Sequence, residues 1–482
     1  MNQTRKRPFL PMAIAVLVGF QGCDFLDPTN VQNPLTTTDD LANAEEPTAA
    51  LLPGLRAQFA RAISAVVSTT ENVSDNYSIH GTGINKDFDN PRAVTSQVAN
   101  GTGTGGGGAY WNIQELRALA DFVLEIATGD ATATQSQIAE ARYYRGVALV
   151  MLAENFSAAP VELDGAALSG RELLTLAVTE LQGATGSGSL AHATLARAYR
   201  LLGDAANAVS SANSALALGD GFYNLQEYDA ATLTNTPHAF LVTRALQEMQ
   251  PLPRLDFLDP KFLSRAAGIA YAKGEEMYLI KAEAAFAGGD FVAGRAELAR
   301  GLRLALSRGT TSFIDNDQRL NADLSIRPRD AAIKVRADDE SPIRSGLVLN
   351  RNGSEVAVPE LSSTSLDPDS VAAIPVGDTD ALWHALHLAR QEILFLEGRR
   401  MSDLGIRLPM MQREIDANPN INPGGPGTEP VVPGYIPAGE TMDFFTPASP
   451  YGPDGTLLTD VVTVNVDMNK VLVANGVSPF LN

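Results

Sequence analysis

The sequence LAHATLARAYRLLGDAANAVSSANSALAL, from Leu190 to Leu218, is the clearest structural signal in the chain. Apolar residues recur at helical spacing on both sides of Gly203-Asp204, a pair typical of a turn between two helices. Small side chains on facing helices allow the two backbones to approach closely. The stretch therefore predicts an antiparallel helical hairpin, with its small and aromatic contact positions at Ala196, Tyr199, Gly203, Ala208, Ala212 and Ala215.

These positions match a tetratricopeptide repeat, in which such hairpins stack side by side. A second copy, EEMYLIKAEAAFAGGDFVAGRAELARGLRLAL, runs from Glu275 to Leu306 and has glycine where the first copy has alanine. In the irregular regions after this copy, only VVTVNV, from Val461 to Val466, is typical of a strand. The expected fold class is mainly α: a tetratricopeptide-repeat-like α-α superhelix with long irregular loops and little β structure. Apolar spacing predicts further helices over 46–67, 110–126, 135–156, 171–181 and 382–404.

The N-terminus has the layout of a lipoprotein export signal. Basic residues from Arg5 to Arg7 precede an apolar run from Phe9 to Phe20, which is too short to span a membrane permanently. Cys23, the only cysteine in the chain, lies where the signal would be cleaved. A lone cysteine in an exported chain has no disulfide partner, so lipidation is favoured over a small buried thiol. We expect a signal peptide over 1–22 and an acylated tether over 23–45.

Beyond the tether, we expect a helical body over 46–410 and an irregular C-terminal segment over 411–482 that packs on it. The chain carries 36 basic and 56 acidic residues, a formal net charge of −20. Such a surface repels phosphate backbones and anionic lipid headgroups. The charge therefore argues against nucleic acid as a partner and favours neutral ligands such as sugars.

Several short motifs follow one another in a recognisable order. They are FLDPTN in the tether, then RYYRGVALVMLAENF, LARAYRLLGD, YLIKAEAAF and LARQEILFLEGRRMSDLG. Together with the lipoprotein signal, this order resembles the SusD/RagB family of outer-membrane lipoproteins over most of the chain. The chain departs from the family in two ways. Glu392 follows Arg390 by two residues, whereas the family has a glutamate three residues after the arginine, and the proline-rich ending of the family is missing. The residues that fit the C-terminal helix pattern of the family are Arg390, Ile393, Glu397, Gly398, Arg399 and Asp403.

The resemblance implies a SusD-like body in which a tetratricopeptide scaffold carries irregular loops. It implies a lipid-anchored protein at the surface of a bacterial outer membrane that binds an oligosaccharide or peptide, without catalysis or a cofactor. Its expected partner is a TonB-dependent outer-membrane transporter, to which the ligand is handed for nutrient uptake. The main alternative is a lipid-anchored tetratricopeptide-type scaffold that binds envelope proteins along its concave face. A lipid-anchored hydrolase is a third hypothesis.

Candidate binding residues are those suited to a sugar, which offers a CH face to aromatic rings and hydroxyls to amides and carboxylates. The polar region after the first predicted helix supplies Asp75, Asn76, Tyr77 and His80, with ordinary loop capping as the alternative. Tyr110 begins the next predicted helix and is a candidate for the edge of a groove. The same holds for Trp111, although core packing is favoured for it because it lies on the apolar face of that helix.

Other motifs carry less weight. Gly103, Gly105 and Gly108 formally spell G-x-G-x-x-G, but no second βαβ unit follows. His384 and His387 lie one helical turn apart, and no third metal ligand accompanies them. The chain has no G-x-S-x-G motif and no thiol outside Cys23. We therefore expect no catalytic residues, no metal site and no cofactor.

Overall fold

The computed structural model describes residues 44–80, 86–100, 108–243, 248–314, 333–344, 355–448, 450–452, 454 and 456–481. The expected signal peptide over 1–22, the acylation site Cys23 and nearly all of the tether over 23–45 lie outside these residues. Within the described ranges, no helix is long and apolar enough to cross a membrane.

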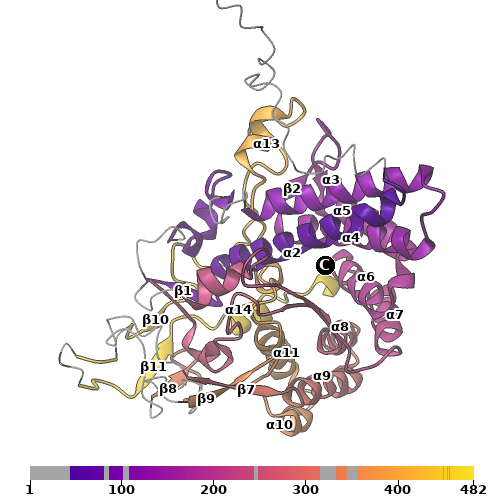
Figure 1. Ribbon diagram of the computed structural model, residues 1–482. Helices are drawn as coiled ribbons and strands as arrows, with labels where there is room; N and C mark the ends of the chain where they lie inside the picture. Colours follow the sequence, from indigo (N-terminus) through magenta and orange to yellow (C-terminus); the bar gives the residue numbers. More distant parts are fainter. Residues whose placement is uncertain are drawn as a thin grey trace, which may run out of the picture.

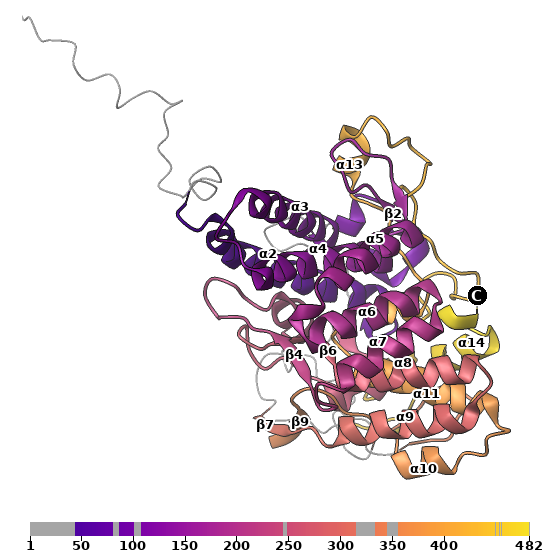
Figure 2. The ribbon, with the colours of Figure 1, turned by 90° about the vertical axis from the view of Figure 1, so that its right-hand side faces the viewer.

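The architecture is a stack of antiparallel helices, each packed on the next along the chain (Figure 1). Figure 2 shows the stack from the side, descending from α2 and α3 to α9. This arrangement confirms the mainly helical, tetratricopeptide-like fold class. The stacked helices are α2 (Pro47–Val73), α3 (Gly108–Gly129), α4 (Gln135–Asn155), α5 (Gly170–Gly183), α6 (Ser189–Leu202), α7 (Ala205–Leu216), α8 (Gly274–Ala287) and α9 (Phe291–Leu306).

Local sequence explains where these helices begin and how closely they pack. Thr134 and Ser169 start α4 and α5 with capping boxes, and Asp204 caps α7 by accepting from the backbone N–H of Asn207 at 3.0 Å. In the hairpin of α8 and α9, a Cβ added to Gly294 would lie 2.3 Å from Cδ1 of Phe286. The glycine therefore permits an approach between the two helices that no larger residue allows.

The helix predicted over 382–404 is interrupted. α11 (Thr379–Ile393) ends eleven residues early, and only the short α12 (Arg400–Asp403) follows. Leu396 and Gly398 have positive φ values of 58° and 73°, which a continuous helix cannot accommodate. The turn between the two helices is buried throughout, so its apolar residues mimic helical periodicity in the sequence. By contrast, α2 is longer than predicted, because it continues to Val73, into a region expected to be loop.

Strands are few and short, and the predicted strand over 461–466 is present as β11 (Val461–Val464). It is the middle strand of a three-stranded sheet, antiparallel to β10 (Phe445–Thr446) and parallel to β8 (Lys334–Arg336). The remaining strands form antiparallel pairs: β1 (Tyr77–Ile79) with β5 (Met249–Pro251), β2 (Ala158–Ala159) with β3 (Leu168–Ser169), β4 (Tyr223–Gln226) with β6 (Ile269–Lys273), and β7 (Thr310–Ile314) with β9 (Glu355–Pro359).

The C-terminal part of the chain lies against the helical stack. α10 (Pro368–Ala373) packs on α9, α14 (Met468–Ala474) packs on α11, and the last turn, Pro479–Leu481, reaches α6 and α8. α13 (Gln412–Ala417) projects from the other end of the molecule (Figure 1). Short 3-10 turns cover Lys86–Asp89, Pro91–Ala93, Val98–Asn100, Thr185–Ser187 and Pro253–Leu258, and a π-helical turn covers His238–Val242.

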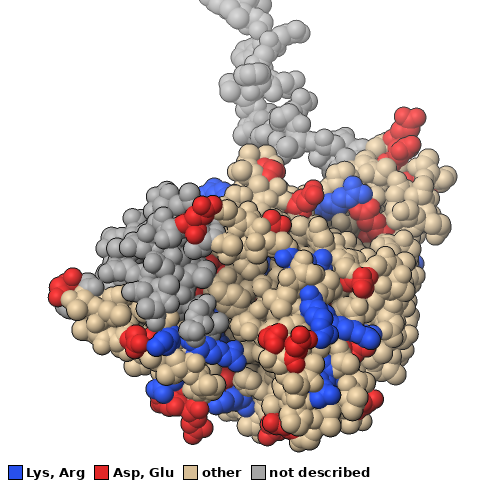
Figure 3. Space-filling model, turned by 90° about the horizontal axis from the view of Figure 1, so that it is seen from below, with Lys and Arg blue, Asp and Glu red and all other residues tan. Residues whose placement is uncertain are grey.

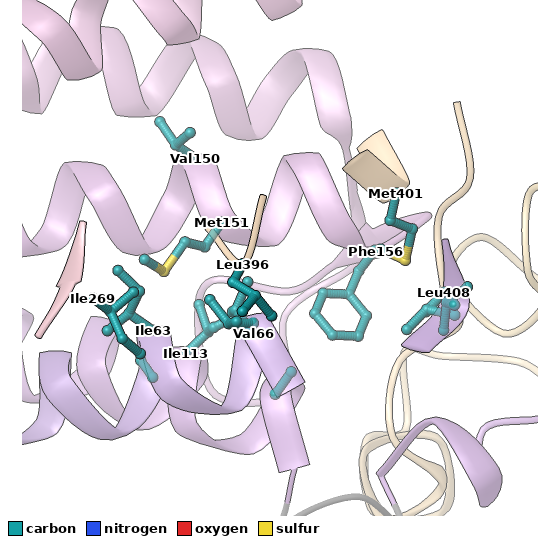
Figure 4. Close-up of a cluster of buried hydrophobic side chains, with 14 of the residues drawn as sticks. Ile63, Val66, Ile113, Val150, Met151, Phe156, Ile269, Leu396, Met401 and Leu408 are labelled. Carbon is teal, nitrogen blue, oxygen red and sulfur yellow. The ribbon is translucent and has the colours of Figure 1, made fainter. Parts of the chain in front are cut away.

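The main hydrophobic core lies where α2, α3 and α4 meet the segment that returns after α11. Figure 4 shows side chains from all of these parts converging. A second, smaller cluster joins α8, α9 and α11 around Phe286. Segments far apart in sequence are thus held in one body. The labelled core residues are Ile63, Val66, Ile113, Val150, Met151, Phe156, Ile269, Leu396, Met401 and Leu408.

Buried ion pairs surround this returning segment and use the residues of the motif ending in EGRRMSDLG. Arg390 donates to Asp403 through Nε and Nη2, both at 2.9 Å, and Lys273 Nζ donates to Glu397 at 2.6 Å. Burial alone would raise the pKa of Asp403, but Arg390 and Arg200 hold it well below its usual range. The motif therefore ties the end of α11 to α6 and β6 in the interior.

Candidate functional site

A groove of about 770 Å³ opens between α3, which lines it from Tyr110 to Glu125, the loop 160–164 and the segment 411–418 that contains α13. It lies at the end of the molecule from which α13 projects (Figure 1). Its lining combines one exposed aromatic ring, aliphatic side chains and many carboxylates. The lining residues are Tyr110, Trp111, Gln114, Glu115, Arg117, Ala118, Asp121, Phe122, Glu125, Pro160, Val161, Glu162, Leu163, Asp164, Met411, Arg413, Glu414, Ala417 and Asn418.

Two consecutive aromatic residues at the start of α3 have different surroundings. Tyr110 is buried, and its ring packs edge-on against Phe156 with centroids 5.1 Å apart. Trp111 is 38% exposed, so it does not pack into the core as its place on the apolar face suggested. The guanidinium of Arg413 lies over the indole, 5.7 Å from the ring centroid. Tyr110 thus fixes the rotation of α3, and Trp111 is the ring presented to the groove.

Hydrogen bonds hold the loop 160–164 against both neighbouring walls. Gln114 Nε2 donates to the carbonyl of Pro160 at 2.8 Å, and Asn420 Nδ2 donates to the carbonyl of Asp164 at 2.6 Å. Asp164 has a φ of +54°, which costs free energy for a residue other than glycine. Beside it, Leu163 is 94% exposed. The braced loop thus presents an exposed leucine in the same groove that Trp111 lines.

The groove lining holds more acidic than basic side chains. Arg117 is engaged locally, because its Nη1 lies 2.6 Å from Asp121 and its Nε donates to Gln114 at 2.8 Å. The carboxylate of Glu414 is near enough to the buried Tyr110 hydroxyl to add to the effect of burial in raising the pKa of that hydroxyl. An aromatic face edged by carboxylates and amides is the chemistry that a sugar ring requires.

No protein-family model and no curated protein sequence matches the chain. The chain is, however, similar to several solved structures. A putative sugar binding protein from Bacteroides vulgatus ATCC 8482 is similar with a TM-score of 0.52 at 13% identity, covering 79% of this chain and 98% of that one. A SusD superfamily protein from Bacteroides fragilis gives 0.50 at 12%, covering 80% and 100%. NanU from B. fragilis gives 0.51 at 11%, covering 83% and 100%.

The chain has the SusD-like fold. This confirms the resemblance that the order of motifs indicated. At 11 to 13% identity the likeness establishes the fold alone. Any function has to be argued from the residues of this SusD-like chain itself.

Three of the predicted binding residues lie inside the SusD-like body. Asp75 is bonded to Arg400, with Nε to Oδ1 at 2.5 Å and Nη2 to Oδ2 at 2.8 Å. Asn76 donates to Glu71 at 2.6 Å, and Tyr77 stacks on Phe395 with centroids 5.9 Å apart. All three are at most 1% exposed and none lines the groove. They follow α2 directly, and the returning segment after α11 covers them.

His80 lies at the edge of the same buried region and is also outside the groove. Its ring packs near Phe444 and Phe445, and its Nε2 lies 3.0 Å from Nε2 of Gln250. Burial, with Lys86 nearby, lowers the pKa of His80 to about 4. Of the six residues nominated from the sequence, the structure therefore brings together only Tyr110 and Trp111. The glycine motif ending at Gly108 lies largely outside the described residues.

Sequence reasoning missed the other groove residues. Arg413, Glu414 and the loop 160–164 are far from Trp111 in the chain and belong to segments with no periodic pattern. Leu163 offered the one available signal, since it is a lone apolar residue between two acids, Glu162 and Asp164.

A second hollow, of about 830 Å³, lies between the segment 335–344, α10, α11 and α14. Among the described residues that line it, aliphatic and charged side chains alternate, and none is tryptophan, tyrosine or phenylalanine. His384 lies on its wall, with Nε2 3.0 Å from Asp467. Without an aromatic platform, this hollow is less suited to a sugar than the groove at Trp111.

Proposed function

We propose that this protein captures an oligosaccharide at the bacterial cell surface and hands it, without chemical change, to a TonB-dependent outer-membrane transporter. The observation that supports capture most directly is the exposed indole of Trp111 in a groove edged by carboxylates and amides. One of the similar solved structures carries the name of a putative sugar binding protein. A glycan is favoured over a peptide because a flat ring beside oxygen acceptors suits a pyranose.

The proposal also covers how the protein is attached to the membrane and which segments build the groove. Acylation of Cys23 would anchor the protein, and the segment 23–45 would act as its leash. The C-terminal segment 411–482 then has a specific role, because its residues 411–418 form one wall of the groove. The body over 46–410 supplies the other two walls.

The capture step is tested by screening the purified protein against immobilised glycans and measuring affinity for the strongest by calorimetry. We expect saturable binding that falls at least tenfold in Trp111→Ala, since loss of an anchoring aromatic costs about 2 kcal/mol. Trp383→Phe is the matched control, because Trp383 packs on Phe286 with centroids 5.5 Å apart, outside the groove. Equal glycan affinity in the two variants would show that the binding site is not at Trp111.

The anchor and the partner are tested in native membranes. We expect the wild-type protein to be acylated at Cys23 and to co-purify in mild detergent with a large TonB-dependent barrel. Cys23→Ser should lose the acyl group and appear in the soluble fraction. Co-purification with envelope assembly factors alone would favour the alternative, a lipid-anchored scaffold for envelope proteins.

A further inference from the structure

We propose that the Trp111 groove selects glycans by charge, binding amino-bearing glycans most tightly, neutral ones next and anionic ones most weakly. The inference rests on the proposed glycan capture and adds the class of substrate. It comes from the carboxylates that line the groove, which outnumber its basic groups.

The lining is strongly unbalanced in charge. Six of its residues are acidic and two are basic. Glu115, Glu125, Glu162 and Asp164 are exposed, and none of them forms an ion pair within the part of the chain that the structure describes. They stand on two different walls, α3 and the loop 160–164. An oligosaccharide lying along the groove from Trp111 would therefore meet negative charge from both walls.

The two arginines in the groove offset only part of this charge. Arg117 is committed to Asp121, and Asp121 also pairs with Arg145, outside the lining. Arg413 covers the indole ring and is the remaining cation. An anionic sugar would meet one available guanidinium, that of Arg413, against four unpaired carboxylates, so the balance of charge still disfavours it.

The acidic excess is not uniform over the protein surface. Figure 3, seen from below, shows several patches of Lys and Arg side chains among the acidic ones. Exposed charge pairs change affinity by up to about fivefold each, and the effects accumulate over several groups. Four uncompensated carboxylates are therefore expected to separate amino and anionic glycans by tenfold or more.

The test uses glycans that share a backbone and differ in charge. β-1,4-linked cello-oligosaccharides are the neutral probes, deacetylated chito-oligosaccharides the cationic ones, and β-1,4-oligoglucuronates the anionic ones. The affinity of each probe is measured at mildly acidic pH. Neutral, cationic and anionic glycans of the immobilised set are compared in the same way. We expect affinity to fall from amino to neutral to anionic on every backbone that binds, and the differences to shrink as salt is raised.

A triple variant, Glu115→Gln, Glu125→Gln and Glu162→Gln, keeps hydrogen-bonding groups while removing charge. It should bring amino and neutral glycans within about threefold of each other and admit anionic ones. The matched control is Glu45→Gln, Glu46→Gln and Glu227→Gln, which changes the net charge equally at exposed positions outside the groove. That control should preserve the order of affinities.

Two results would overturn the inference, and they differ in what else they overturn. Anionic glycans that bind as well as their neutral counterparts, with affinity lost in Trp111→Ala, would refute charge selection while leaving glycan capture intact. The absence of any Trp111-dependent binding across all classes would refute glycan capture and charge selection together.

Discussion

Asp75 and Arg400 show how a polar side chain that resembles a binding group in sequence becomes structural in the fold. Both are at most 2% exposed, and the carboxylate is shared with Gln391, whose Nε2 donates to it at 3.0 Å. Removing one member of a buried pair leaves an uncompensated charge in a medium that solvates it poorly. Breaking the pair is therefore expected to destabilise the fold by more than the intact pair stabilises it.

Arg400→Met should lower the free energy of unfolding by about 3 kcal/mol, the low end for a broken buried pair because Arg254 Nη2 still lies 3.6 Å from Asp75, and urea denaturation measures it. Arg303→Met is its control, because Arg303 and Asp369 form a pair whose side chains are 54% and 86% exposed. That substitution should change the free energy of unfolding by no more than about 0.5 kcal/mol. Similar losses in the two variants would mean that burial does not set the cost.

Trp111 marks the limit of what sequence says about single residues. Apolar spacing correctly predicted the helix and nominated Tyr110 and Trp111, but it favoured the core for a ring that is 38% exposed. A helical pattern gives the width of the apolar stripe, while its edges depend on what packs there. Here the stripe edge meets α13, some 300 residues later in the chain, and no local pattern encodes that meeting.

At the scale of helices, most of the stack was predictable because each hairpin is local. Alanine and glycine at contact positions, with Gly203-Asp204 at the turn, specify two helices within 30 residues. The break after Ile393 was not predictable. It lies next to Glu397, which pairs with Lys261 and Lys273 at 2.6 Å, and no local pattern encodes these contacts between distant parts of the chain.

The glycine in the second hairpin gives a test of close helix packing. Gly294→Ala should destabilise the protein by about 1 to 3 kcal/mol, because the added Cβ collides with the buried Phe286 ring. Gly54→Ala in α2 is the control, since nothing lies within 4 Å of its added Cβ. It should leave stability unchanged or raise it by up to about 1 kcal/mol. Thermal unfolding would measure both, and a harmless Gly294→Ala would refute the packing constraint.

For the whole molecule, buried ionisable groups make stability depend on pH. His387 stacks on Trp383, with centroids 5.9 Å apart, and burial lowers its pKa to about 3. The unfolded chain takes up this proton near pH 6.5, so stability is lost as pH falls from about 6.5 toward 3. Burial raises the pKa of Glu71 to about 7 and also raises that of Asp89, and these two act in the opposite direction.

His387→Phe keeps a ring in the stack and removes the titrating group. Between pH 6.5 and 4, the wild type should lose about 1 kcal/mol more per pH unit than the variant. Because Glu71 and Asp89 are unchanged in both proteins, the difference isolates His387. Urea denaturation at several pH values measures it. Parallel pH profiles would show that His387 does not stay neutral in the fold.

The measurement that bears most directly on glycan capture uses the fact that the chain has only two tryptophans. In Trp383→Phe the emission comes from Trp111 alone, and in Trp111→Phe it comes from Trp383 alone. On titration with the best oligosaccharide from the screen, we expect a saturable change in the emission of Trp111 with the affinity found by calorimetry, and none in that of Trp383. Undiminished binding with no change at Trp111 would contradict the assignment of the groove.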